Sequence, residues 1–181
     1  MAAGDGLVIM TPTSIAYSGT FAGINSDGGV DFTAVTSLSL NGVFTSSFDN
    51  YCIVWYGINT VQTRGLRLRL RLSGTDATGT DYTFQNLTAS STTVSGSRTT
   101  SADHYQALSQ STVYQGYNIH SYGPALAQAT AFRSVGISTG NTAQIADFAG
   151  THSLATAYDG VTLYPGGDAM TGNVVVFGYE E

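Results

Sequence analysis

The segment Gly65–Leu72 constrains the fold more than any other, because leucine and arginine alternate through it without a break. In an extended strand, successive side chains point to opposite faces, so Leu66, Leu68, Leu70 and Leu72 share one face. Four exposed leucines in a row would make an aggregation-prone edge. The alternation therefore predicts a strand over 66–73 whose leucine face lies on a packed core.

The opposite face of this strand carries Arg67, Arg69 and Arg71, three of the six positive charges of the chain. Like charges at this spacing repel one another where water is excluded, so the row needs solvent or anionic partners. Three interpretations are open. The row is a solvated face paired with Asp, Thr or Tyr of neighbouring strands, a subunit interface, or a surface for an acidic ligand such as an anionic glycan. We take the three arginines as candidate interface residues.

The composition favours strands over helices throughout the chain. Lysine is absent, the two glutamates are the last two residues, and only 10% of residues are charged, whereas the chain holds 22 Gly, 11 Tyr and 8 Phe beside many Thr and Ser. Such a composition is typical of strands and turns. The net charge of −6 argues against nucleic-acid binding, which needs clustered basic residues.

Period-2 alternation between turn clusters predicts a series of short strands, as in a sandwich or barrel. We expect one domain over 1–181, with 1–13 as a candidate N-terminal arm and 88–112 as a long loop region, within which 88–101 is a long exposed loop or a poorly packed edge strand. One short helix is a candidate over 101–111, although a loop fits equally well. The predicted strands are Leu7–Met10, Ile15–Phe21, Val30–Leu40, Tyr51–Ile58, Leu66–Ser73, Tyr82–Leu87, Gln115–His120, Phe132–Ser138, Ala143–Phe148, Val161–Tyr164 and Asn173–Tyr179.

No motif in the chain indicates an enzyme, a cofactor or a metal. His104, His120 and His152 are far apart without zinc spacing, and the nucleophile-elbow and nucleotide-binding motifs are missing. The pairs Asp76 with Asp81 and Asp159 with Asp168 could serve a glycosidase. Turn chemistry explains these aspartates, and also the calcium-like stretch 158–168, without catalysis or metal. Cys52, the single cysteine, is expected to be a buried free thiol.

A tyrosine-rich stretch, "VYQGYNIHSYG" over 113–123, supplies a second set of candidate contact residues, Tyr114, Tyr117 and Tyr122. Flat rings with a polar hydroxyl stack on sugar faces. The same residues suit a sandwich core or an oligomer interface equally well. We therefore take them as candidate receptor or subunit contacts.

The N-terminal segment does not predict a signal peptide, because no basic region precedes its short apolar run, Leu7–Met10. No run of residues approaches the length of a membrane span. We expect synthesis in a cytoplasm and no membrane insertion.

Three segments resemble small virion proteins of tailed bacteriophages, many of them marine. They are "AVTSLSLNGVFTSSFDNYCIVWYG" (34–57), "LRLRLRLSGTDATGTDYTFQNL" (66–87) and "GVTLYPGGDAMTGNVVVFGYEE" (160–181). The similar features are the Val-Phe and Asp-Asn-Tyr before an apolar strand, the leucine- and arginine-rich strand, and the closing aromatic-Gly-aromatic. Residues 88–155 do not align with this group.

The resemblance implies an all-β, antiparallel, jelly-roll-like β-sandwich with a structural and non-enzymatic role. Such modules decorate capsids or form parts of tails and fibres, usually as homotrimers. We therefore expect a virion protein that is assembled in the host bacterial cytoplasm and contacts other capsid or tail proteins. The alternative is a module that binds a host surface glycan as receptor.

Overall fold

Strands account for all of the regular structure in residues 6–59, 65–107, 113–138 and 144–179, which are the residues that the computed structural model describes. No helix in these ranges is long and apolar enough to cross a membrane. The strands are β1 Leu7–Ile9, β2 Ser14–Ile24, β3 Val30–Asn41, β4 Asn50–Asn59, β5 Leu66–Leu72, β6 Thr75–Asp76, β7 Tyr82–Ser90, β8 Thr93–Ala102, β9 Tyr105–Gln106, β10 Gln115–Tyr122, β11 Thr130–Ser138, β12 Gln144–His152, β13 Gly160–Pro165 and β14 Met170–Tyr179.

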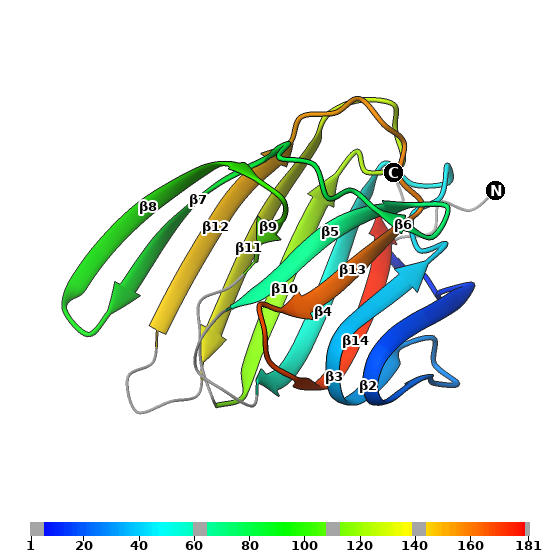
Figure 1. Ribbon diagram of the computed structural model, residues 1–181, viewed down its shortest axis with the longest axis horizontal. Coiled ribbons are helices and arrows are strands. Elements are labelled where there is room, and N and C mark those ends of the chain that lie inside the picture. The colour runs from blue at the N-terminus through cyan, green and yellow to red at the C-terminus, as the bar shows by residue number, and fades with distance from the viewer. Residues whose placement is uncertain (1–5, 60–64, 108–112, 139–143, 180–181) are drawn as a thin grey trace.

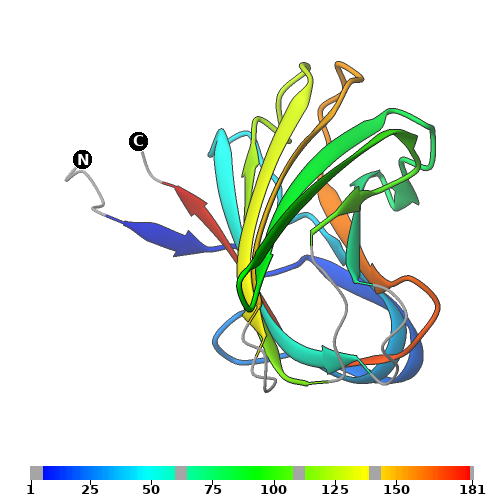
Figure 2. The same cartoon turned by 90° about the vertical axis from the view of Figure 1, so that its left-hand side faces the viewer.

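The strands form one curled antiparallel sheet in the order β6-β5-β13-β3-β14-β4-β10-β11-β12-β7-β8 (Figure 1). Strand β1 pairs with β14, β2 with β3, and β9 with β5. The sheet curls round its own interior, so that β5 and β13 form a narrow layer opposite a broad layer running from β14 to β8 (Figure 2). The predicted all-β, antiparallel, jelly-roll-like β-sandwich is thereby confirmed.

Strand β3 makes the corner between the two layers. Its residues 30–35 pair with β14 of the broad layer, and its residues 38–41 pair with β13 of the narrow layer. Ala34 has a left-handed φ of 48°, and the register with β2 shifts between Ser18 and Gly19. Gly19 has a φ of +130°, and a Cβ there would lie 2.2 Å from the Ala34 carbonyl oxygen. Only glycine allows the two strands to approach so closely at this bend.

The leucine face of β5 lies in the core, with one exception. Leu66, Leu68 and Leu70 are fully buried, and their cross-strand neighbours Leu163 and Val161 on β13 are buried beside them. Leu72, in contrast, is 44% exposed. The prediction that all four leucines enter the core was wrong for Leu72, because the pairing of β5 with β13 ends at Arg71 and Leu72 lies opposite only Thr75 of the two-residue strand β6.

The eleven predicted strands all overlap observed ones, and β6, β8 and β9 are additional. Part of the candidate arm 1–13 pairs with the sheet, because Leu7 lies opposite Tyr179 and Ile9 opposite Phe177. Of the predicted long loop 88–112, residues 93–102 form β8, an edge strand hydrogen-bonded to β7. The structure thus confirms the edge-strand alternative for this segment, and the prediction of a loop there was wrong.

The candidate helix over 101–111 was wrong for its described part. Ser101 and Ala102 end strand β8, and Tyr105 and Gln106 form β9. The Tyr105 ring stacks on Phe132 with centroids 4.8 Å apart, and its hydroxyl bonds the Phe148 carbonyl at 3.0 Å. Burial of the Tyr105 ring in the core stabilises the extended conformation of this segment, whereas a helix of this length would be only marginally stable. Residues 108–112 lie outside the described residues.

Candidate functional site

The outer face of the broad layer carries a continuous band of exposed apolar side chains. The registers of the strands align Tyr56 on β4 with Ile137 on β11, Ile145 on β12 and Val94 on β8, across Gly116 and Ala89. The adjoining row contains Val54, Val135 and Leu87, with the polar residues Asn118 and Asp147 between them. We call these seven residues the apolar band, and each is between 37% and 65% exposed.

The apolar band is large for an exposed surface. With full areas of roughly 150–250 Å² for residues of this size, the exposed fractions correspond to on the order of 700 Å². The largest apolar patch of a typical monomer is roughly 300–600 Å². A standard protein interface buries roughly 800 Å² on each partner. The apolar band therefore has the size of a binding surface.

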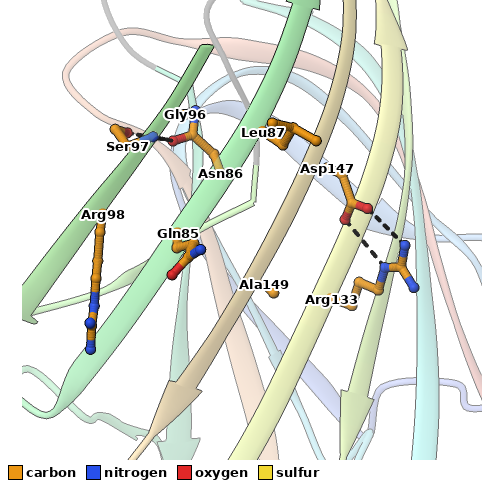
Figure 3. Close-up of a pocket in the computed structure, with 9 residues that line it drawn as sticks. All are labelled: Gln85, Asn86, Leu87, Gly96, Ser97, Arg98, Arg133, Asp147 and Ala149. Atoms are coloured by element: carbon orange, nitrogen blue, oxygen red, sulfur yellow. Dashed lines mark hydrogen bonds and ion pairs between the residues drawn. The ribbon is translucent and has the colours of Figure 1, made fainter. Parts of the chain in front are cut away.

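A shallow polar groove of about 720 Å³ adjoins the apolar band over β11, β12, β7 and β8 (Figure 3). Two hydrogen bonds of 3.2 and 2.7 Å join the Arg133 guanidinium to Asp147, and they raise the pKa of Arg133. The Arg98 side chain extends along the groove away from that pair (Figure 3). Small residues keep the groove open, and its lining consists of Gln85, Asn86, Leu87, Gly96, Ser97, Arg98, Arg133, Asp147 and Ala149.

Arg71, at the end of the arginine row, is buried and bonded within the chain. Its guanidinium donates to Ser39 Oγ at 2.8 Å, to Thr162 Oγ1 at 2.7 Å and to Asn41 Oδ1 at 3.1 Å. It also pairs with the Asp76 carboxylate and donates to the Gly74 carbonyl. Because only 8% of Arg71 is exposed, this side chain acts as a polar core residue.

Arg69 and Arg67 make fewer polar contacts with the described residues than Arg71 does. Arg69 pairs with the Asp103 carboxylate, donates to the Asp103 carbonyl at 2.8 Å, and lies 4.8 Å from the centroid of the Tyr164 ring. The Nε of Arg67 is buried and has no hydrogen-bond partner among the described residues. Intramolecular contacts thus account for Arg69 and Arg71, and a subunit interface at the arginine row stays a prediction.

The three candidate tyrosines occupy different environments. Tyr117 is buried, with its ring 6.1 Å from that of Trp55. Tyr114 is 47% exposed and stacks on Tyr56 of the apolar band, with centroids 5.4 Å apart. Tyr122 is exposed and stacks on His120. Tyr114 thus extends the apolar band, Tyr122 lies elsewhere on the same face, and the ring of Tyr117 packs in the core.

Two of the aspartates singled out for enzyme chemistry make structural bonds. The Asp76 carboxylate accepts from Arg71 and, at 2.7 Å, from Thr162, and Asp159 accepts from the Ser73 N–H at 2.9 Å. Cys52 is buried, and burial raises the pKa of its thiol. Among the described residues, no cluster of three or more His, Cys, Asp or Glu could hold a metal ion.

Acid is expected to destabilise the fold through His152. This side chain is fully buried against Tyr82 and Tyr158, and burial lowers its pKa, with Asp81 acting weakly in the opposite direction. The unfolded chain takes up the proton near pH 6.5 and the folded chain only at lower pH. Stability should therefore be lost as the pH falls below about 6.5. Thermal melting at pH 7.5 and 5.5 should show a smaller drop for His152→Gln than for the wild type, and an equal drop would contradict this role.

The fold and its outer face together define the class of this protein. It is an antiparallel β-sandwich whose broad layer presents an apolar band beside a polar groove. No protein-family model and no curated protein matches the chain.

Solved structures show distant likenesses. A Caenorhabditis elegans galectin, LEC-6, is 12% identical with a TM-score of 0.39, over 87% of this chain and 100% of that one. The SPRY domain of human HERC1 is 9% identical with a TM-score of 0.30, over 97% and 99%. A CBM35 module from Paenibacillus barcinonensis is 12% identical with a TM-score of 0.19, over 89% and 94%. These likenesses concern the fold alone.

Proposed function

We propose that this chain is a non-enzymatic structural module of a bacteriophage virion, which self-associates through the apolar band. The observation that carries the proposal is the size and continuity of the band across β4, β11, β12, β7 and β8. Seven apolar side chains that stay in water on a folded monomer favour association, because burying them releases about 25 cal/mol per Å². The occupant we assign to the band is a second copy of the chain, in a homotrimer on the outside of the capsid or tail.

The spatial arrangement of the segments that resemble phage virion proteins supports this role. Segments 34–57 and 160–181 contain β13, β14 and most of β3 and β4, and segment 66–87 contains β5, β6 and most of β7. In the sheet all of these strands except β7 are consecutive, in the order β6-β5-β13-β3-β14-β4. The resemblance therefore covers one contiguous group of strands, together with β7 on the far side of β10, β11 and β12. The region 88–155, which does not align, supplies β10, β11 and β12 and much of the apolar band.

Replacing Ile145 by aspartate is expected to weaken self-association by about 10- to 100-fold, because it places a charge at the centre of the band. Ile145 is 61% exposed, so the fold itself should be unaffected. Light scattering at micromolar concentrations should show three times 18.9 kDa for the wild type and a lower mass for Ile145→Asp. Leu154→Asp is the matched control, because Leu154 is 45% exposed but lies in the loop after β12.

The second candidate function is recognition of a host surface glycan in the polar groove. The groove favours it because amide and guanidinium groups on Gln85, Asn86 and Arg98 line a space of ligand size. A wild type that stays monomeric up to about 100 μM while retaining a sugar on a glycan array would overturn the assembly proposal in favour of this one. A trimer with no glycan hit would reject the second candidate.

A further inference from the structure

Strand β8 is an edge that lacks the usual protection against pairing with another chain. In the described part of the molecule it pairs only with β7, and it ends the sheet (Figure 1). Every side chain from Thr93 to Ser101 is exposed, on both faces of the strand. Natural edges are short, bulged, covered, or carry lysine or proline. Strand β8 is ten residues long, contains no proline and has one charge, Arg98.

The other long edge, β2, differs from β8 in shape. The register of β2 shifts in its middle, between Ser18 and Gly19, so that the strand bends. Strand β8 keeps a regular register with β7 from Thr93 to Thr99, and the irregularity lies beyond, where Tyr82 and Phe84 pair. A bulge twists an edge away from partners, whereas a flat edge offers a straight ladder of backbone groups. Of the two, β8 is therefore the edge suited to pairing.

The backbone groups that face the open edge follow from one hydrogen bond. The Ser97 N–H donates to Asn86 Oδ1 on β7 at 3.1 Å, so the Ser97 peptide groups face β7. Successive residues of a strand direct these groups to alternate edges. The N–H and C=O groups of Gly96 and Arg98 therefore point away from the sheet.

We propose that β8 pairs antiparallel with β8 of a second copy, about a twofold axis that passes through Ser97. A twofold contact uses the same edge on both copies, so it needs no second complementary surface. With the axis at Ser97, the regular part of β8 pairs over Ser95–Thr99, because the register with β7 is irregular beyond Thr99 and Ser101 has a left-handed φ of 55°. Each Arg98 then lies opposite Gly96 of the other copy, where no side chain obstructs it.

Alternative registers are less favourable. An axis through Arg98 would place two guanidinium groups directly opposite each other, and like charges in that position are destabilising. An axis through Gly96 would pair residues 93–99 but would place each Arg98 opposite the β-branched Val94 of the other copy and not opposite a glycine. The pattern of side chains along β8 thus selects the register with the axis at Ser97.

This contact is a different surface from the apolar band and does not rest on the proposed function. Residues that lie opposite each other in an antiparallel pair point to the same face of the sheet. Pairing of two β8 strands would therefore join two broad layers into one sheet, with both apolar bands on the same side. Combined with a trimer through the band, a twofold contact closes into an assembly of six copies when the twofold and threefold axes intersect at right angles.

Cross-linking through Ser97→Cys tests the register. The two substituted residues would face each other at a non-hydrogen-bonded position, with Cα atoms about 4.5 Å apart, which is within disulfide range. Oxidation of the full-length variant with diamide should give a disulfide-linked dimer on non-reducing gels. The matched control is Ser95→Cys, which is also an exposed serine on the same face and whose copies would lie about 13 Å apart. Wild-type protein controls for Cys52, which is buried.

The expected result is at least about tenfold more dimer for Ser97→Cys than for Ser95→Cys. Equal cross-linking of both variants, or none for Ser97→Cys, would overturn the proposal. Repeating the experiment with Ile145→Asp added separates the two surfaces. The Ser97→Cys dimer should persist there, and its loss would show that the contact depends on the apolar band and not on the β8 edge.

Discussion

Replacing Arg71 by methionine is expected to lower the free energy of unfolding by about 3–5 kcal/mol, one of the largest effects in the chain. Methionine keeps the apolar stem but removes the guanidinium group. The Asp76 carboxylate then keeps only the Thr162 hydroxyl as donor, the Gly74 carbonyl loses the guanidinium, and Ser39 and Thr162 lose a charged partner. A buried polar group that loses its partner costs more free energy than the hydrogen bond contributes when it is formed. Urea unfolding, or a melting temperature lower by about 10 °C, would show the loss.

The control for this prediction is Arg98→Met, the same substitution on the exposed strand β8. It should change the free energy of unfolding by no more than about 0.5 kcal/mol. A double variant with Asp76→Ala should cost less than the sum of the two single changes, because both remove the same interaction. If Arg71→Met cost less than about 1 kcal/mol, the guanidinium would be behaving as a solvent-screened surface charge, and its core role would be refuted.

Replacing Leu68 by alanine is expected to cost about 2–5 kcal/mol, through lost burial and the cavity that remains. Leu68 is fully buried between Leu163 on β13 and Tyr105 on β9. Tyr105 stacks on Phe132 and bonds Ser134, so the neighbouring rings are held in place and cannot close the cavity. Differential scanning calorimetry of the variant would measure the loss directly.

Leu72→Ala is the matched control in the same alternating segment. Leu72 is 44% exposed, so its truncation should cost at most about 1 kcal/mol. If the two variants were equally destabilised, Leu72 would have to be buried too, for example by another copy of the chain. A uniform effect would then point to an interface at this end of β5.

Much of the strand content could be predicted from the sequence, because alternation is a local property of the chain. The run of residues 66–72 shows its two faces without reference to any neighbour, and the same holds for "NVVVFGY" at the end. Strand β8 was harder to predict, since its serines, threonines and glycine do not form an apolar face. Its strand conformation depends on the ladder with β7. Tyr105 was mistaken for part of a helix for a similar reason, because its packing partners lie on β11 and β12.

Most of the candidate site could not be predicted from the sequence. The arginine row was predicted as an interface because its charges are regularly spaced, yet Arg69 and Arg71 make ion pairs within the chain. One signal of the apolar band was present in the sequence: the run Ile53-Val54-Trp55-Tyr56 is apolar at consecutive positions, so both faces of that strand must be apolar. Such a run does not say whether the second face is covered. Of the three candidate tyrosines, only Tyr114 lies at the band.

By itself the sequence determined that the chain forms short antiparallel strands with a leucine-lined core, because period-2 alternation and turn residues act over a few positions. Only the tertiary structure decided which arginine is buried, which leucine is exposed, and which strand is left at the open edge. Those outcomes depend on which strands, distant in the sequence, become neighbours. The apolar band exists because five strands align their outward residues in register, and no single segment contains the information for that alignment.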